Sequence, residues 1–160
     1  MVIVYLALGS NIDKEKNLKR CIDILQKKFK VLKVSSVYVT SPVGYKSQPN
    51  FYNRAIEIET DLPPKKLFGK LMKIEKQLKR VRKKKNHPRT IDIDILFYGD
   101  KILKLKNLII PHPRLHKRSF VLVPLNEIAP KFKHPVLKKT ISELLKRLKG
   151  EGVLRSIRWL

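Results

Sequence analysis

The chain of 160 residues has a single cysteine, Cys21, and lacks several common sequence signals. One cysteine excludes an internal disulfide and any zinc module built from several cysteines. No run of 18 apolar residues occurs, which excludes an ordinary membrane-spanning helix. The glycine-rich patterns GxxxxGK[ST] and GxGxxG are absent, so a nucleotide would have to be held by side chains and metal. GxSxG and HExxH, which mark α/β-hydrolases and zinc proteases, are absent too.

Acidic residues are scarce, because 13 Asp and Glu stand against 37 Lys and Arg, for a formal net charge of +24. Such an excess is typical of nucleic-acid-binding proteins, and it equally suits any polyanionic ligand. Lysines on solvated helix faces would produce the same total, so composition does not locate the charge. The hydrophobic share of 42% is too high for a disordered chain, and the length fits one domain, 1–160.

Hydrophobic periodicity predicts alternating strands and helices. We expect strands at 2–8, 31–39, 51–60, 90–98 and 153–159, a hairpin at 101–110, and helices after Asp13, after Pro63-Pro64, at 120–128 and at 140–148. The order βαββαβ is the ferredoxin-like split pattern. The expected fold class is α+β, with a ferredoxin-like core whose mainly antiparallel sheet is flanked by helices in three α-β-α layers. Because the first apolar run has no basic residues before it, we expect a strand rather than a signal peptide, and a cytoplasmic protein.

The clearest chemical signal is the segment 91–95, which reads IDIDI. Because side chains alternate across a strand, the three isoleucines face the core, while Asp92 and Asp94 project together from the other face. Two carboxylates so close repel each other unless a cation lies between them. A divalent metal resolves this repulsion, and hard oxygen ligands favour magnesium. The alternative is a solvent-exposed strand face, although aspartate is a poor strand former.

Basic residues bracket this acidic strand: Arg80, Arg82, Lys83, Lys84, Lys85 and Arg89 precede it, and His112, Arg114, His116, Lys117 and Arg118 follow. Magnesium held by carboxylates and flanked by guanidinium groups is what phosphoryl transfer requires. For most of the lysines a solvated loop is the alternative. Pro113 and the lack of a nearby cysteine or acidic partner argue against zinc between the two histidines.

Glu75 lies beside the apolar stripe of the second predicted helix, one turn after Leu71. It either pairs with Lys79 at i,i+4 or faces the acidic strand, where it could bind a metal-bound water or a ligand amine. The sequence leaves both arrangements open.

Residues 88–96, PRTIDIDIL, closely resemble the PRTLDLDIL signature of the 6-hydroxymethyl-7,8-dihydropterin pyrophosphokinase family. Further family-like blocks are ALGSN at 7–11, TSPVG at 40–44, QPNFYN at 48–53, RVR at 80–82, IPH at 110–112, RSF at 118–120 and PLNEIAP at 124–130. The combination is specific because separated blocks fall in the family's order within a chain of the right length. Two positions depart from it: Asn86-His87 stands where many relatives have Trp-Gly, and Pro113 follows His112 where an aromatic residue can occur.

The resemblance implies transfer of pyrophosphate from ATP to the hydroxymethyl group of 6-hydroxymethyl-7,8-dihydropterin, with release of AMP, in folate biosynthesis. It implies that two Mg²⁺ ions bind Asp92 and Asp94, and that Arg82 and Arg89 join them in catalysis, Arg82 from a mobile lid loop. The implied ATP contacts are Glu75, Arg82, Arg89, Ile95, His112 and Arg118. The implied pterin contacts are Thr40, Val43, Phe51, Asn53 and Phe120, with the ring stacked between the two phenylalanines; each phenylalanine taken alone would be expected in the core.

A basic RNA- or DNA-binding module of ferredoxin-like fold is the alternative function. It predicts steeply salt-dependent binding, but it gives no reason for two aspartates on one strand face, which would repel phosphate. The nearest match to an RNA-recognition signature, KRSFV at 117–121, lacks the glycine and the second aromatic residue. We therefore expect an ATP-dependent diphosphotransferase, a monomer whose partners are ATP and the pterin, without nucleic acid or membrane.

Overall fold

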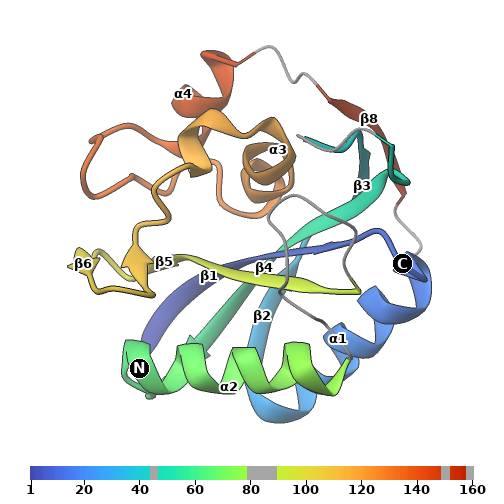
Figure 1. The fold of residues 1–160 in the computed structure, drawn as a ribbon. Coiled ribbons are helices and arrows are strands. Elements are labelled where there is room, and N and C mark those ends of the chain that lie inside the picture. Colours follow the sequence, from blue (N-terminus) through green and yellow to red (C-terminus); the bar gives the residue numbers. More distant parts are fainter. Residues whose placement is uncertain (44–46, 79–89, 149–151, 158–160) are drawn as a thin grey trace.

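The computed structural model describes residues 1–43, 47–78, 90–148 and 152–157, and Figure 1 shows their arrangement. The elements in chain order are β1 (Val2–Ser10), α1 (Lys14–Lys28), β2 (Lys30–Val34), β3 (Val37–Thr40), β4 (Phe51–Thr60), α2 (Pro64–Gln77), β5 (Asp92–Tyr98), β6 (Leu103–Lys104), β7 (Ile109–Ile110), the 3₁₀ turn η1 (Leu115–Lys117), α3 (Ser119–Ile128), α4 (Ile141–Lys146) and β8 (Val153–Ile157).

The main sheet has the strand order β5-β1-β4-β3-β8, and β2 also pairs with β4. All of its pairings are antiparallel. When β2 and β3 are counted as one interrupted strand, β1 and β4 lie in the centre and β5 at the edge, which is the arrangement that the βαββαβ order produces. The predicted ferredoxin-like α+β class is therefore confirmed, and the predicted hairpin is present as β6 and β7.

The prediction of a single strand over 31–39 is wrong, because a break at Ser35-Ser36 divides it into β2 and β3. The Ser35 hydroxyl accepts the Ala55 backbone N–H at 2.8 Å, and Arg54 donates to the Ser35 carbonyl from Nη2 at 2.6 Å and from Nε at 3.1 Å. Glu127, from α3, accepts the Ser36 backbone N–H at 2.9 Å. These side-chain contacts supply the backbone partners that a regular ladder would have supplied.

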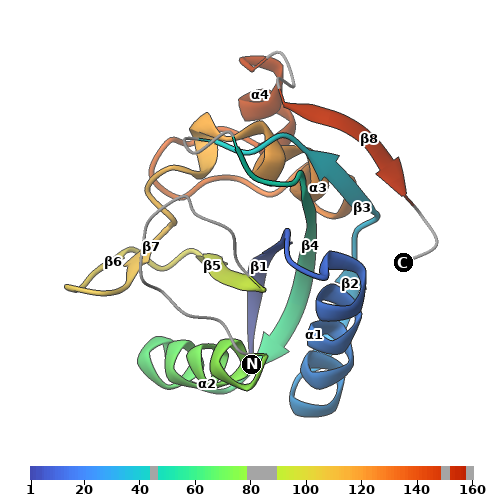
Figure 2. The same ribbon diagram turned by 45° about the vertical axis from the view of Figure 1, so that its right-hand side comes forward.

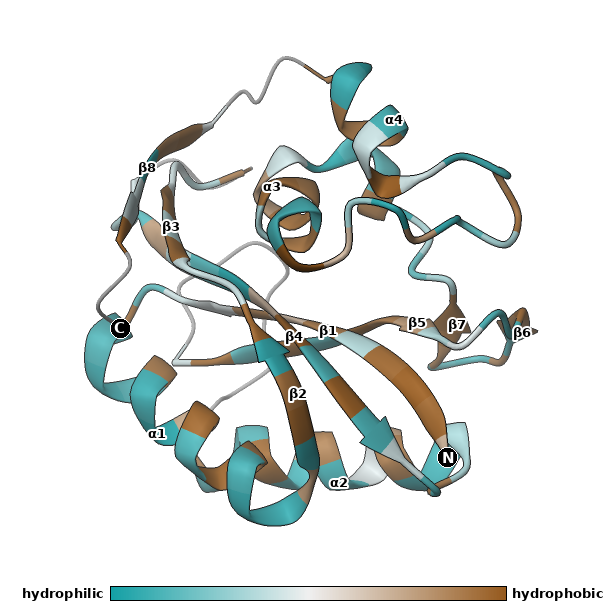
Figure 3. Ribbon diagram, turned by 180° about the vertical axis from the view of Figure 1, so that it is seen from behind, coloured by the Kyte–Doolittle hydropathy of each residue, from teal (hydrophilic) through white to brown (hydrophobic). Residues whose placement is uncertain are grey.

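Helices cover both faces of the sheet in three α-β-α layers, as predicted (Figures 1 and 2). On one face, α1 and α2 turn apolar residues toward the strands, as the hydropathy colouring in Figure 3 shows. This core contains Cys21 together with Ile91, Ile93 and Ile95. On the other face, α3 and α4 pack over a second core, in which the ring centroids of Phe97 and Phe132 lie 4.7 Å apart.

The two helices of the first layer begin differently from each other. Pro64 starts α2 in the position expected from the Pro63-Pro64 pair. Asp13 precedes α1, as expected, but its backbone is left-handed, with φ 43°, and its side chain makes no capping hydrogen bond. The Asp13 carbonyl instead accepts the Asn17 backbone N–H at 2.8 Å.

Strand register brings four chain segments together at one end of the sheet. Gly9, near the end of β1, lies opposite Asn53 on β4 and opposite Asp92 on β5. Thr40, at the end of β3, lies opposite Phe51, at the start of β4. Residues from four separate strands therefore meet around Gly9, and this register positions the candidate site.

Candidate active site

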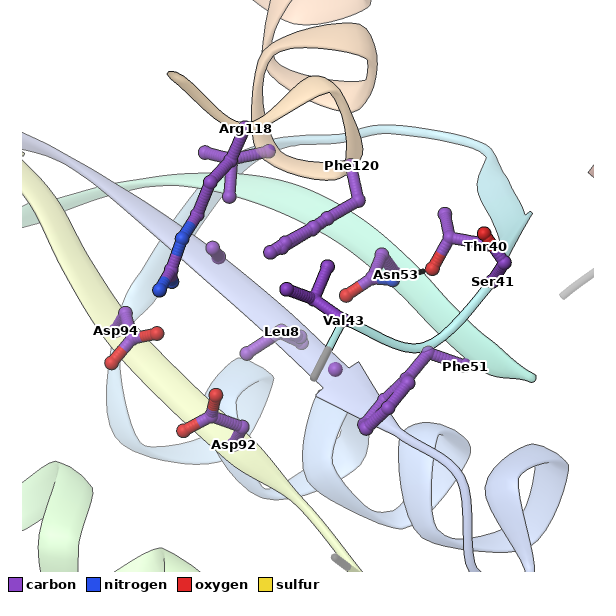
Figure 4. Close-up of a pocket in the computed structure, with 13 residues that line it drawn as sticks. Leu8, Thr40, Ser41, Val43, Phe51, Asn53, Asp92, Asp94, Arg118 and Phe120 are labelled. Atoms are coloured by element: carbon purple, nitrogen blue, oxygen red, sulfur yellow. Dashed lines mark hydrogen bonds between the residues drawn. The ribbon is translucent and has the colours of Figure 1, made fainter. Parts of the chain in front are cut away.

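A pocket opens at this end of the sheet, on the face covered by α3 (Figure 4). It is lined by Ala7, Leu8, Gly9, Thr40, Ser41, Val43, Phe51, Asn53, Asp92, Asp94, Arg118, Phe120 and Val121. The structure thus gathers in one cavity all five residues predicted to contact the pterin, both aspartates, and Arg118. Phe51 and Phe120 are only half-buried and belong to neither core, which is the arrangement expected of ligand-binding rings.

The two aspartates occupy the face of β5 predicted from the IDIDI pattern. Ile91, Ile93 and Ile95 are buried in the core beside α1 and α2, while Asp92 and Asp94 are half-buried and line the pocket. In Figure 4 Arg118 extends from the start of α3 toward Asp94. Two carboxylates on one strand face suit magnesium, which binds through one or two carboxylates and completes its shell with water and substrate phosphates. The donor set therefore fits the expected metal.

β5 is the edge strand of the sheet, and two contacts hold its outer side. Glu75, on α2, is only 2% exposed, and its carboxylate accepts the Ile93 backbone N–H at 2.8 Å. The His112 backbone N–H donates to the Leu96 carbonyl at 3.0 Å. Of the two arrangements left open for Glu75, the structure shows the one facing the acidic strand. Glu75 contacts the backbone between Asp92 and Asp94, and it is absent from the described lining of the pocket.

Polar groups at the inner end of the pocket are held in fixed positions. Asn53 Nδ2 donates to the Thr40 hydroxyl at 2.5 Å. The side-chain oxygen Oδ1 of Asn53 lies close to Gly9: a Cβ atom added at Gly9 would be 2.8 Å from it. Glycine at this position therefore leaves room for the Asn53 amide, which any larger residue would have to displace from its hydrogen bond with Thr40. ALGSN was singled out as a family-like block, but its glycine was not predicted to take part in the site.

A second pocket lies on the other side of the acidic strand and shares Asp94 with the first. It contains two of the predicted ATP contacts, Ile95 and His112, and it has a volume of about 280 Å³. Sequence reasoning missed most of its lining, namely Phe68, Lys106, Asn107, Leu108, Ile109 and Pro113. The turn of the β6–β7 hairpin supplies several of these residues, and its sequence carries no signal of ligand binding.

His112 is held as a neutral imidazole in this second pocket. Burial lowers its pKa to about 4; the positive charge of Arg118 contributes, and the opposing effect of Asp92 is smaller. The His112 Nδ1 atom accepts the Arg114 backbone N–H at 3.2 Å. Since Nδ1 is an acceptor in a neutral ring, the proton resides on Nε2, which can donate a hydrogen bond to an anion.

Three predicted residues, Arg80, Arg82 and Arg89, lie outside the described residues, as do Asn86 and His87. The expected lid loop and its arginines therefore remain predictions. Across the described ranges, no helix has the length and apolar character needed to cross a membrane. In the same part of the chain, no group of three or more His, Cys, Asp or Glu side chains is arranged to hold a metal.

The fold and this pair of pockets define an α+β protein in which an acidic strand borders two neighbouring cavities. The family model for 7,8-dihydro-6-hydroxymethylpterin-pyrophosphokinase matches residues 5–130, which is most of the chain. The chain belongs to this family. The resemblance seen in the sequence is therefore confirmed.

Individual relatives agree with this assignment. The chain is 40% identical over 156 residues to the 2-amino-4-hydroxy-6-hydroxymethyldihydropteridine pyrophosphokinase of Aquifex aeolicus, covering 97% of this chain and 95% of that protein. It is 46% identical over 129 residues to the protein of the same name from Bacillus subtilis, covering 79% and 77%. Among solved structures, Plasmodium falciparum HPPK-DHPS A437G with STZ-DHP superposes with a TM-score of 0.74 at 20% identity, covering 91% of this chain and 45% of that one, which shows the shared fold.

Other relatives are much longer than this chain. It is 42% identical to the folic acid synthesis protein FOL1 of Dictyostelium discoideum over 97% of its own length, yet it spans only 24% of that protein. For the corresponding protein of Pneumocystis carinii the share is 20%.

Proposed function

We propose that this chain transfers pyrophosphate from ATP to the hydroxymethyl group of 6-hydroxymethyl-7,8-dihydropterin and releases AMP, as a step of folate biosynthesis. The observation that carries the proposal is the position of Asp94, which lines both pockets. Substrates bound in the two pockets would therefore meet beside this carboxylate. The residues around each pocket suit one of the two substrates.

The first pocket suits the pterin. Phe51 and Phe120 offer two aromatic faces to a flat heterocycle, and stacked rings gain contact area. Asn53 and Thr40 present a fixed polar edge, because their mutual hydrogen bond restricts both side chains. Val43 is 57% exposed and borders the opening, so a bound ring would cover it.

The second pocket suits the nucleotide. The side chains of Ile95 and Leu108 would provide apolar surface for a base, and Lys106 would supply a cation. His112 would donate from Nε2 to a phosphate oxygen without adding a charge, because it is neutral. Arg118, at the mouth of the first pocket, would contact phosphates as well. Glu75 supports this arrangement through the backbone of Ile93.

The transfer itself needs positioning more than proton transfer. The hydroxymethyl oxygen would attack the β-phosphorus in line while the chain holds both substrates in contact. Asp92 and Asp94 would bind two Mg²⁺ ions, which offset the charge of the triphosphate. Arg82 and Arg89 are proposed to stabilise charge that develops during transfer. The enzyme would act as a cytoplasmic monomer of one domain, 1–160, without a nucleic-acid partner.

Product analysis tests this function. With ATP, magnesium and the hydroxymethyl-dihydropterin, AMP should appear in step with the pterin diphosphate. Formation of ADP, or ATP consumption that does not depend on the pterin, would contradict it. Asp92→Asn and Asp94→Asn, which keep the side-chain volume, should each abolish turnover while leaving the circular dichroism spectrum unchanged. Near-normal activity in either variant would refute the metal role.

A further inference from the structure

A basic groove adjoins the pterin pocket, and the proposed reaction does not account for it. It lies between the loop after β3, the start of α3 and the end of α4, and its volume is about 820 Å³. Four cationic side chains line it: Arg114, Lys117, Arg118 and Arg147. Ser41, Val43, Arg118 and Phe120 line the pterin pocket as well, so the two cavities are neighbours across these residues.

All charged residues in the described lining of the groove are basic. No aspartate or glutamate is found among the described residues that line the groove. Arg114, Lys117 and Arg147 are exposed, and neither of the two described salt bridges involves any of the three. The first turn of α3 contains no acidic residue that would offset the positive end of the helix dipole. Lys117 and Arg118, at this end of the helix, add further positive charge. Like charges gathered at such an end favour a bound anion.

The position of the groove indicates which anion. An anion in the pterin pocket lies beside Asp92 and Asp94, which repel it when no cation is bound between them. On the other side of Arg118 and Phe120, the charged residues lining the groove are basic, so the groove attracts an anion that the two aspartates repel. A pterin ring in the first pocket that carries a diphosphate would present this anionic group to the neighbouring groove.

We propose that the basic groove is a metal-independent binding site for a diphosphate group, and that it receives the diphosphate of the pterin product as the product leaves the pocket. The identity of that product rests on the proposed function. Free inorganic diphosphate shares the same chemistry, and the experiment separates the two sources.

The test compares two charge-matched triple variants of the full chain. Arg114→Gln, Lys117→Gln and Arg147→Gln remove the three cations that the reaction does not use. Lys65→Gln, Lys66→Gln and Lys70→Gln, on the exposed side of α2, remove the same charge at a remote position. All six positions are exposed, so both proteins should fold, and thermal unfolding verifies this.

Isothermal titration with inorganic diphosphate in EDTA tests the groove without any turnover. The parent and the α2 variant should bind it, and the groove variant should bind at least tenfold more weakly. Equal binding by the parent and the groove variant, or no binding by the parent, would overturn the proposal.

Titration with the pterin diphosphate, again in EDTA, tests the product. The parent should bind it at least tenfold more tightly than the pterin alone, and the groove variant should lose this preference. A preference retained by the groove variant would overturn the role in product release. Single-turnover formation of AMP with magnesium should be the same in all three proteins. Absence of AMP in the parent would refute the proposed function, whereas the inorganic diphosphate titration still decides the groove.

Discussion

Replacing Glu75 tests whether a buried carboxylate on a helix sets the geometry of the acidic strand. Its carboxylate accepts the backbone N–H of Ile93, the residue between Asp92 and Asp94. Glu75→Ala removes this acceptor and leaves a buried donor on an edge strand. Glu75→Gln retains an acceptor oxygen and nearly the same volume, so the pair separates the hydrogen bond from the charge.

The expected magnitude follows from the burial of this contact. A hydrogen bond to a charged group contributes about 1.5–3 kcal/mol, and a buried donor left without its partner costs about 1–3 kcal/mol. Since Glu75 is 2% exposed, Glu75→Ala should lower the free energy of unfolding by about 2–4 kcal/mol. Glu75→Gln should stay within about 1 kcal/mol of the parent, because the acceptor remains and a buried charge is removed.

Denaturant unfolding measures the stability, and the magnesium dependence of AMP formation measures the geometry. When Ile93 is no longer anchored, the separation of the two carboxylates varies, so Glu75→Ala should need at least tenfold more magnesium for half-maximal turnover. Glu75→Gln should need less than threefold more. The reasoning is refuted if Glu75→Ala unfolds within about 0.5 kcal/mol of the parent. If both variants instead raise the KM for ATP equally, the carboxylate contacts the nucleotide directly, as the family resemblance implied.

Three further predictions concern single residues. Gly9→Ala should raise the KM for the pterin at least tenfold, because its Cβ would displace the Asn53 amide. The control Gly69→Ala, in an open helix position, should leave this KM unchanged and stabilise the fold by about 0.5–1 kcal/mol. Equal KM values for the two variants would contradict this. The pKa of His112 is lowered from 6.5 to about 4, so between these pH values the unfolded chain takes up a proton that the folded chain does not. The free energy of unfolding should therefore fall as the pH is lowered from 6.5 toward 4. An NMR titration of His112 in the folded protein with a midpoint above about 6 would be inconsistent with this. Burial, with a smaller effect of the Glu75 charge, raises the pKa of Cys21 to about 12, so a thiol reagent at neutral pH should react only on unfolding, and rapid labelling of the native protein would refute this.

Patterns along single segments predicted much of the fold. The alternation in IDIDI correctly placed the isoleucines in the core and the aspartates on the opposite face. The spacing of Leu67, Leu71 and Ile74 correctly predicted α2 and its buried side. Both results follow from the repeat of one strand or one helix, which depends only on neighbouring residues.

The break between β2 and β3 shows where such patterns fail. Strand-forming residues flank Ser35-Ser36 on both sides, which led to the prediction of one strand, yet the strand is interrupted there, where Arg54 and Glu127 bind the backbone. Both residues are distant in sequence, so no local rule includes them. The secondary structure of this segment is set by tertiary contacts.

The sequence by itself determined the chemistry available to this protein: two aspartates on one strand face, an excess of cations, and family-like blocks in a specific order. Only the tertiary structure decided which of these residues meet. Gly9 lies opposite both Asn53 and Asp92 because three strands pair in one register, and Asp94 borders two pockets because β5 lies at the sheet edge. The basic groove likewise joins residues from η1, from α3 and from the segment that follows α4. Register and the packing of distant elements depend on the whole core, and so they cannot be read from any one segment.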